Sequence, residues 1–205
     1  MPRVASARVA GRRSASASGL LFPLDVMYER AGVAPLKVRR ISADKIPLPY
    51  RTLLDHEDSM TSTLEHHFGG RLGMRTLSTR MNASGYFRRV LLVRAETGQP
   101  VAMGAARINL ATLLPRVRAR ILLNADPLGR VLHGEGVDYI SRPLAFLAVT
   151  PNQELMGVFW MRGSQTLFGR RTEMIHQGRK IGDVVEILPP GLARAPSASV
   201  AHVRA

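Results

Sequence analysis

Two pairs of apolar segments, each joined by a tight turn, dominate the middle and the end of the sequence. In the first pair, residues 86–94 are rich in Val and Leu, and residues 101–108 return after the turn cluster 95–100. Gly98 lies in that cluster and can adopt the positive φ that many tight turns need. Val- and Leu-rich runs bounded by such a cluster are typical of hairpin strands. The pattern therefore predicts antiparallel pairing.

Short helical segments accompany these hairpins. Residues 60–68 read as one helix, with Asp58 or Ser59 as its N-cap and Gly69 as its end. Further short helices are expected over residues 50–55, 109–114 and 128–132, further strands over 72–78 and within 137–150, and the second hairpin over 168–176 and 181–188. Hairpins with short helices between them favour an α+β fold, a central antiparallel sheet with helices on one side.

The length of 205 residues and a hydrophobic content of 45% fit one domain with a real core. We expect a disordered basic tail over residues 1–20, a folded domain over 21–189 and a second disordered tail over 190–205. The arginines of the first tail, without any acid, would also fit a transit peptide. The Arg12–Arg13 pair would fit a twin-arginine export signal, but polar residues follow it. We therefore favour a tail on a cytoplasmic protein.

The formal net charge of +14 raises the question of a nucleic-acid partner. Aromatic residues make up only 5% of the chain, which is little for base stacking, and no zinc-finger or RNA-binding signature is present. No apolar run approaches the roughly 20 residues of a membrane-spanning helix. Arginine also binds small carboxylates through two parallel hydrogen bonds. We therefore disfavour nucleic-acid and membrane partners and favour a carboxylate ligand.

Metal and disulfide chemistry find little support in the sequence. The chain has no cysteine, which excludes disulfides and thiolate ligands. His66 and His67 are adjacent on the expected helix, where their side chains point about 100° apart and cannot readily share an ion. His56 lies near Asp55 and Asp58 without a recognisable ligand pattern. We expect neither a metal nor another cofactor.

Four segments of the chain occur in an order that is known from one enzyme family. They are residues 54–61 (LDHEDSMT), 87–92 followed by 100–102, 126–132 (DPLGRVL), and 167–172 running through Gly178 to 185–189. Together they resemble the chorismate lyase family over residues 50–190. The resemblance implies a sheet whose face and covering loops bury a small aromatic acid. It also implies a cofactor-independent lyase that eliminates pyruvate from chorismate to give 4-hydroxybenzoate.

The same resemblance implies roles for four residues. Arg88 matches the arginine that grips the ring carboxylate, and the backbone amide of Leu128 matches a second contact to that group. Met60 matches a residue that contacts the ligand from the lid side. Glu186 matches the acid beside the ring oxygen that carries the leaving group. We therefore take Arg88 and Glu186 as candidate catalytic residues and all four as candidate substrate-binding residues.

Residue chemistry supports this pair of candidates. Arg88 can hold a carboxylate bidentately, and strand alternation sends Arg89 to the other face of the sheet. Glu186 interrupts an apolar strand, where an acid is costly to bury without a partner. Burial would suit it to acid–base work or to hydrogen-bonding a ring hydroxyl. Strand alternation turns one of Arg170 and Arg171 inward, where it could supply a second carboxylate contact. Which of the two faces the pocket is left open, and we take Arg171 as a further substrate-binding candidate.

Two departures and two alternatives remain. Arg89 stands where the bacterial enzymes carry an acid, and residues 150–161 look longer than the family pattern, which puts the pocket lid in doubt. The runner-up function is a non-catalytic binding module for an aromatic acid on the same fold, as in certain transcription regulators. Such regulators need an N-terminal DNA-binding domain, for which residues 1–50 look too short. The third is nucleic-acid binding, and the oligomeric state is left open.

Overall fold

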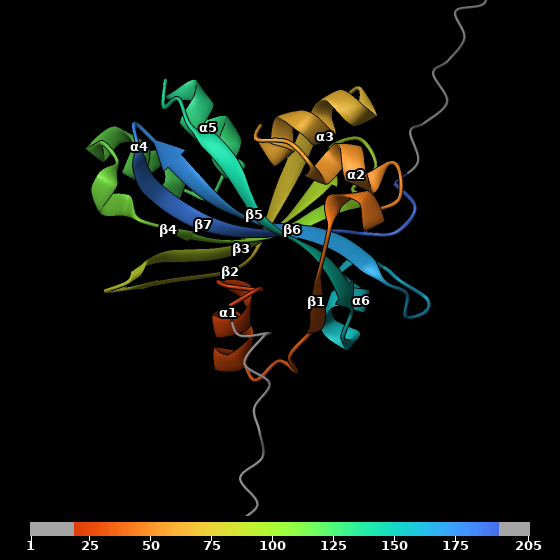
Figure 1. Cartoon of the computed structure of the whole chain (residues 1–205). Helices are drawn as coiled ribbons and strands as arrows, with labels where there is room; N and C mark the ends of the chain where they lie inside the picture. The colour runs from red at the N-terminus through yellow and green to blue at the C-terminus, as the bar shows by residue number, and fades with distance from the viewer. Residues whose placement is uncertain (1–18, 193–205) are drawn as a thin grey trace, which may run out of the picture.

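A single antiparallel sheet forms the centre of the chain in our computed structural model, which describes residues 19–192 (Figure 1). The expected tails over residues 1–20 and 190–205 lie almost wholly outside the described residues. In spatial order the sheet contains β1 (Lys37–Ile41), β5 (Ile140–Thr150), β6 (Leu167–His176), β7 (Arg179–Leu188), β4 (Pro100–Ile108), β3 (Gly85–Arg94) and β2 (Leu72–Asn82). Every neighbouring pair is antiparallel. The predicted α+β class and antiparallel sheet are confirmed.

Helices cover both faces of this sheet, whereas we had expected them on one side. On one face lie α2 (Tyr50–Leu54), α3 (Met60–Phe68), α4 (Pro115–Leu122) and α5 (Leu128–Gly134), and on the other lie α1 (Leu24–Arg30) and α6 (Gln153–Val158) (Figure 1). Short 3-10 turns occupy Ala43–Lys45 and Leu110–Thr112. The face under α1 and α6 is apolar enough to need cover, because Leu91, Met103 and Val185 point into it and are buried.

Helix α3 shows why the local prediction succeeded. Ser59 adopts the extended conformation of an N-cap, the helix runs from Met60 to Phe68, and Gly69 ends it with φ 68° in the left-handed region. Met60 and Leu64, four residues apart on one helix face, are buried. The expected helix and both of its ends are confirmed.

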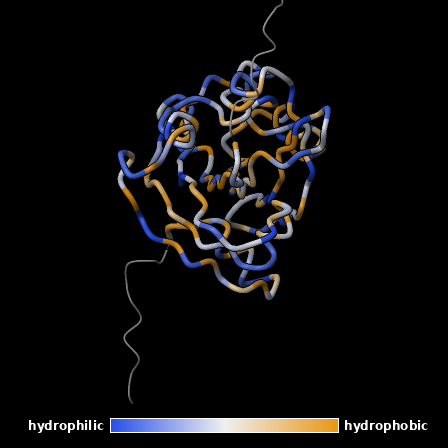
Figure 2. The backbone as a smooth tube through the Cα atoms, turned by 90° about the vertical axis from the view of Figure 1, so that its right-hand side faces the viewer, coloured by the Kyte–Doolittle hydropathy of each residue, from blue (hydrophilic) through white to orange (hydrophobic). Residues whose placement is uncertain are grey.

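The side chains divide into three buried apolar groups. One lies between the sheet and α1 with α6, one lies under α2 and α3, and one lies under α4 and α5. Figure 2 shows orange hydrophobic stretches running through the interior of the molecule, with blue hydrophilic stretches mostly on its outer loops. The second and third groups share one face of the sheet and meet between α3 and α5. The site described below lies at that junction.

Residues 150–161 do not form a lid on the ligand face. Asn152 caps helix α6 by accepting a hydrogen bond from the backbone N–H of Leu155, and Leu155 and Phe159 are buried with α1. Trp160, near the end of this segment, is 59% exposed. The segment therefore extends the core on the opposite face of the sheet. None of the helices within residues 19–192 has the length and apolar character needed to span a bilayer.

Candidate functional site

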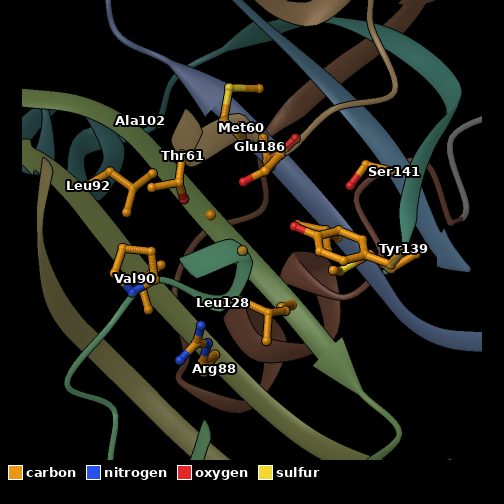
Figure 3. A pocket seen from close by; sticks show the side chains of 17 residues that line it. Met60, Thr61, Arg88, Val90, Leu92, Ala102, Leu128, Tyr139, Ser141 and Glu186 are labelled. Atoms are coloured by element: carbon orange, nitrogen blue, oxygen red, sulfur yellow. The ribbon is translucent and has the colours of Figure 1, made fainter. Parts of the chain in front are cut away.

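A pocket lies between the sheet and the beginnings of helices α3 and α5 (Figure 3). Its empty space, including the mouth, is about 610 Å³. The sheet contributes a mostly apolar floor: Val90 and Leu92 from β3, Ala102, Gly104 and Ala106 from β4, Met174 from β6, and Val184 from β7. The pocket exists because the three β4 positions carry no side chain larger than a methyl group. The helices can therefore bridge the floor without filling the space above it.

Arg88 and Glu186 both line this pocket and stand at opposite ends of the group of side chains in Figure 3. Arg88 on β3 pairs with Ala106 on the neighbouring strand β4, and Ala106 pairs on its other side with Val184 on β7. Glu186 lies two residues further along β7. Two strand spacings and two residues correspond to roughly 12 Å between their Cα atoms. The two long side chains can therefore approach the ends of one small ring-bearing molecule.

Arg88 is a buried cation that has no protein partner among the described residues. Its side chain is 1% exposed, and within residues 19–192 it makes no ion pair or hydrogen bond, with Nη1 fully inaccessible. Burial lowers the pKa of Arg88 to about 10, so the guanidinium is still charged at neutral pH. An unpaired buried charge is costly, and an anion in the pocket would remove that cost.

Glu186 is half-buried, and its charged partner is the buried Arg170. The Nε of Arg170 donates to Oε2 of Glu186 at 2.6 Å. Within the described residues no protein donor reaches the other carboxylate oxygen, Oε1. A carboxylate held in this way presents one acceptor oxygen to the pocket.

Of the five residues proposed from the sequence, four line the pocket and one does not. Met60, Arg88, Leu128 and Glu186 are brought together there. Arg171 lies on the opposite face, where its Nη1 donates to the carbonyl of Gly19 at 2.6 Å and its Nη2 is 3.9 Å from Asp183. The assignment of Arg171 to the pocket is therefore wrong.

A β-bulge is the physical reason for that error. Near the turn, His176 pairs with Arg179, but the register shifts by one residue between Met174 and Ile175. Beyond this shift Arg170 pairs with Glu186. A one-residue slip exchanges the two faces of a strand, so Arg170 and not Arg171 shares the face of Glu186.

Arg89 lies on the far face of the sheet, as strand alternation predicts. Its Nη1 is 2.7 Å from Oε1 of Glu154 on α6, and its guanidinium lies 5.1 Å from the centre of the Tyr28 ring. Tyr28 donates its hydroxyl hydrogen to Glu154, and burial together with that hydrogen bond raises the pKa of Tyr28. Arg89 therefore joins α1 and α6 to the sheet and takes no part in the pocket.

Polar residues that the sequence did not reveal complete the pocket wall. Ser59 and Thr61 come from the start of α3, and Tyr139 and Ser141 from the start of β5. Burial is the main cause that raises the pKa of Tyr139, so its hydroxyl keeps its proton. Isolated Ser, Thr and Tyr residues at strand and helix ends carry no sequence signal of this kind.

Gly129 allows α3 and α5 to meet at the pocket. A Cβ atom there would stand 2.2 Å from Oγ of Ser59 and 2.9 Å from the hydroxyl of Tyr139. Both helices thus begin at the pocket wall, with N–H groups of the first turn that have no partner within the helix. Within residues 19–192 no group of three or more His, Asp and Glu side chains is arranged to hold a metal ion.

Comparisons with known proteins give little beyond this geometry. No family model and no curated protein matches the sequence, so the resemblance to chorismate lyases has no family match behind it. Among solved structures, a gene product of Staphylococcus aureus shares 6% identity over 64% of this chain and 87% of its own, with a TM-score of 0.48. The C-terminal domain of PhnF shares 11% identity over 65% and 89%, with a TM-score of 0.45.

The C-terminal domain of the histidine utilization repressor from Pseudomonas syringae shares 10% identity over 61% of this chain and 96% of its own, with a TM-score of 0.41. We base neither family membership nor function on similarities of this size.

Proposed function

We propose that this chain binds a small ring-bearing carboxylate, with the guanidinium of Arg88 on the carboxylate group. The observation that carries the proposal is the burial of Arg88, at 1% exposure, beside an apolar pocket and without a protein partner within residues 19–192. A carboxylate matches the guanidinium fork in two charge-assisted hydrogen bonds. No neutral ligand would offset the cost of the buried charge as well.

The remaining pocket residues support the rest of the ligand. The apolar floor, which β3 and β7 line with Val and Leu and β4 with Ala and Gly, suits the face of a ring. Glu186 Oε1 would accept a hydrogen bond from a hydroxyl at the end of the ring away from the carboxylate. The resemblance to chorismate lyases adds the backbone N–H of Leu128 beside the carboxylate and Met60 against the ring.

Isothermal titration calorimetry with 4-hydroxybenzoate tests the carboxylate contact. We expect binding by the unchanged protein and at least a hundredfold weaker binding of 4-hydroxybenzyl alcohol, which has the same ring and hydroxyl group but no carboxylate. Equal affinities for the acid and the alcohol would contradict the role of Arg88. Benzoate, which lacks the hydroxyl, measures the contribution of Glu186 separately.

Chorismate lyase activity is the second candidate function, favoured by the position of Glu186 in the same pocket as Arg88. Loss of pyruvate from chorismate makes the ring aromatic and is strongly downhill. The site would need to fix the reactive conformer, accept one proton and stabilise charge on the departing oxygen. Arg88 would hold the ring carboxylate, and Glu186 would interact with a ring oxygen at the far end.

Incubation with chorismate distinguishes the two functions. A lyase releases pyruvate and 4-hydroxybenzoate in equal amounts, and Arg88→Ala and Glu186→Gln lose this activity. A binding module retains affinity for 4-hydroxybenzoate but gives no more product than a boiled control. The second result would exclude the enzyme and leave the binding proposal standing.

A further inference from the structure

Arg170 on β6 is fully buried, and its guanidinium has more hydrogen-bond partners than its ion pair with Glu186 alone. Besides Oε2 of Glu186, its guanidinium donates to three backbone carbonyls: Leu54 at 3.1 Å, His56 at 2.7 Å and Asp58 at 3.4 Å. One side chain therefore binds both the acid of the pocket and the chain segment that connects α2 to α3. A rigid fork with five N–H donors can do this, whereas an ammonium group has only three.

The connection between α2 and α3, residues 55–59, depends on such external partners. It forms no helix or strand, so its backbone carbonyls must be satisfied from elsewhere. Arg170 takes alternate carbonyls, and the backbone N–H of Ser141 donates to the carbonyl of Glu57 at 2.8 Å. Ser59, the last residue of this connection, forms one wall of the pocket together with Met60 and Thr61. Arg170 and the N–H of Ser141 therefore both hold the segment that leads into this wall.

We infer that Arg170 is a positioning residue that locks the pocket wall at residues 55–61 to Glu186. We call this connection of residues 55–61 to Glu186 through Arg170 the lock. The identity of the ligand rests on the proposed function, whereas the lock itself does not. Arg170 does not line the pocket, so it acts through Glu186 and through the wall. Because a single guanidinium holds both, the wall can move outward only if the hold on the connecting segment is released. The rates at which a ligand enters and leaves the pocket then depend on Arg170.

Arg171 offers a matched control. It is the next residue on the same strand, it also donates to a backbone carbonyl and approaches an acid, but it does so on the opposite face of the sheet. Arg170→Lys and Arg171→Lys therefore make the same chemical change one residue apart. Only the first change removes donors from the wall of the pocket.

Hydrogen exchange of the ligand-free protein tests the lock. Arg170→Lys is expected to accelerate exchange at amides 55–61 at least tenfold, while Arg171→Lys leaves them within twofold of the unchanged protein. In stopped-flow binding of 4-hydroxybenzoate, Arg170→Lys is expected to raise the dissociation rate at least tenfold, again without an effect of Arg171→Lys. Unchanged exchange at 55–61 in Arg170→Lys, or equal acceleration in both variants, would overturn the inference.

A second variant covers the case in which Arg170→Lys does not fold. Glu186→Gln keeps an acceptor for Arg170 but removes the charge, and it should accelerate exchange at 59–61 at least threefold. No change there would overturn the coupling. If the unchanged protein binds no 4-hydroxybenzoate while the exchange results hold, the proposed ligand is wrong and the lock stands. If binding is normal and exchange is insensitive to Arg170, the lock is wrong and the proposed function stands.

Discussion

Two buried guanidinium groups face the same side of the sheet, and they differ in how they are satisfied. Arg170 has a carboxylate and three carbonyls around it, whereas Arg88 has no protein partner within residues 19–192. A satisfied buried charge holds structure in place, and an unsatisfied one weakens the protein until a ligand arrives. The contrast separates a residue that positions from a residue that binds.

Replacement of Arg88 by methionine should expose this difference. Methionine fills a similar volume without a charge, so Arg88→Met is expected to raise the free energy of unfolding of the ligand-free protein by about 1–3 kcal/mol. The same change should abolish carboxylate binding. Chemical denaturation and calorimetry measure the two effects. Lower stability together with retained binding would show that Arg88 has a structural role instead.

His56 lies against Arg170, and its protonation makes the contacts of Arg170 depend on pH. Its Nε2 lies 2.9 Å from the carbonyl of Leu53 and its Nδ1 lies 3.3 Å from Nη1 of Arg170, so the neutral ring with hydrogen on Nε2 fits both neighbours. Burial first, and then the charge of Arg170, lower the pKa of His56 below 6.5, against the weaker opposing effects of the hydrogen bond to the Leu53 carbonyl and of the charges of Glu186 and Asp58. Protonation would place an N–H group against the donors of Arg170.

The stability of the protein should therefore fall as the medium becomes acidic. Between the lowered pKa of folded His56 and its ordinary value of 6.5, the unfolded chain binds a proton that the folded chain does not. The contribution of neutral His56 to the free energy of unfolding is thus fully present above about pH 6.5–7. It is lost as the pH falls from there through the lowered pKa of folded His56. Urea unfolding of the unchanged protein and of His56→Gln at several pH values measures it. Parallel pH profiles would count against it.

At the scale of secondary-structure elements, the junction of α3 and α5 fixes the shape of the pocket. Gly129→Ala is expected to destabilise the protein by about 1–3 kcal/mol, because the new methyl group meets Ser59 and Tyr139. Gly134→Ala is the control, since a Cβ at Gly134 on the same helix meets nothing within 4 Å. That change should be neutral or stabilise by up to about 1 kcal/mol. Thermal unfolding compares them.

A rescue variant sharpens the same prediction. Shortening the nearest neighbour with Ser59→Ala should recover part of the loss in Gly129→Ala, because the closest contact is with the Ser59 hydroxyl. Equal effects of alanine at positions 129 and 134 would show that the two helices adjust to the added methyl group without cost.

The elements that were predictable from the sequence are those whose signals are local. The hairpins follow from Val- and Leu-rich runs with turn residues between them, and α3 follows from its N-cap and the glycine at its end. Helices α1, α4 (Pro115–Leu122) and α6 and strand β1 were not among the expected elements. Strand β1 has no apolar alternation, because it lies at the edge of the sheet and no residue of it is fully buried.

The residues of the candidate site also divide into those that could be predicted from the sequence and those that could not. Arg88 and Glu186 could be proposed because the resemblance to chorismate lyases marks both positions, and Glu186 is also an acid in an otherwise apolar strand. Strand alternation placed Arg89 correctly. The side of Arg170 and Arg171 could not be predicted, because one bulge between Met174 and Ile175 exchanges the two faces. The row Ala102, Gly104 and Ala106 was a usable signal for a cavity that we did not recognise. Alternate small residues in a buried strand leave space that nothing else fills.

At the scale of the whole molecule, the pocket joins parts of the chain that are otherwise packed separately. Met60, Leu92 and Ala102 belong to the apolar group under α2 and α3, whereas Ala106 and Leu128 belong to the group under α4 and α5. A ligand between them contacts both groups and the sheet. Binding should therefore stabilise the entire fold and not one element alone.

This coupling predicts a ligand-dependent melting temperature. A ligand that binds only the folded chain adds about 2.7 kcal/mol of stability at a concentration one hundred times its Kd, and the gain rises with concentration. For a folded region of this size that corresponds to an increase of roughly 5–10 °C. Differential scanning calorimetry with 4-hydroxybenzoate should show this increase in the unchanged protein and none in Arg88→Met. An equal increase in both would mean that the ligand binds elsewhere, because the variant differs only by the charge that faces the pocket.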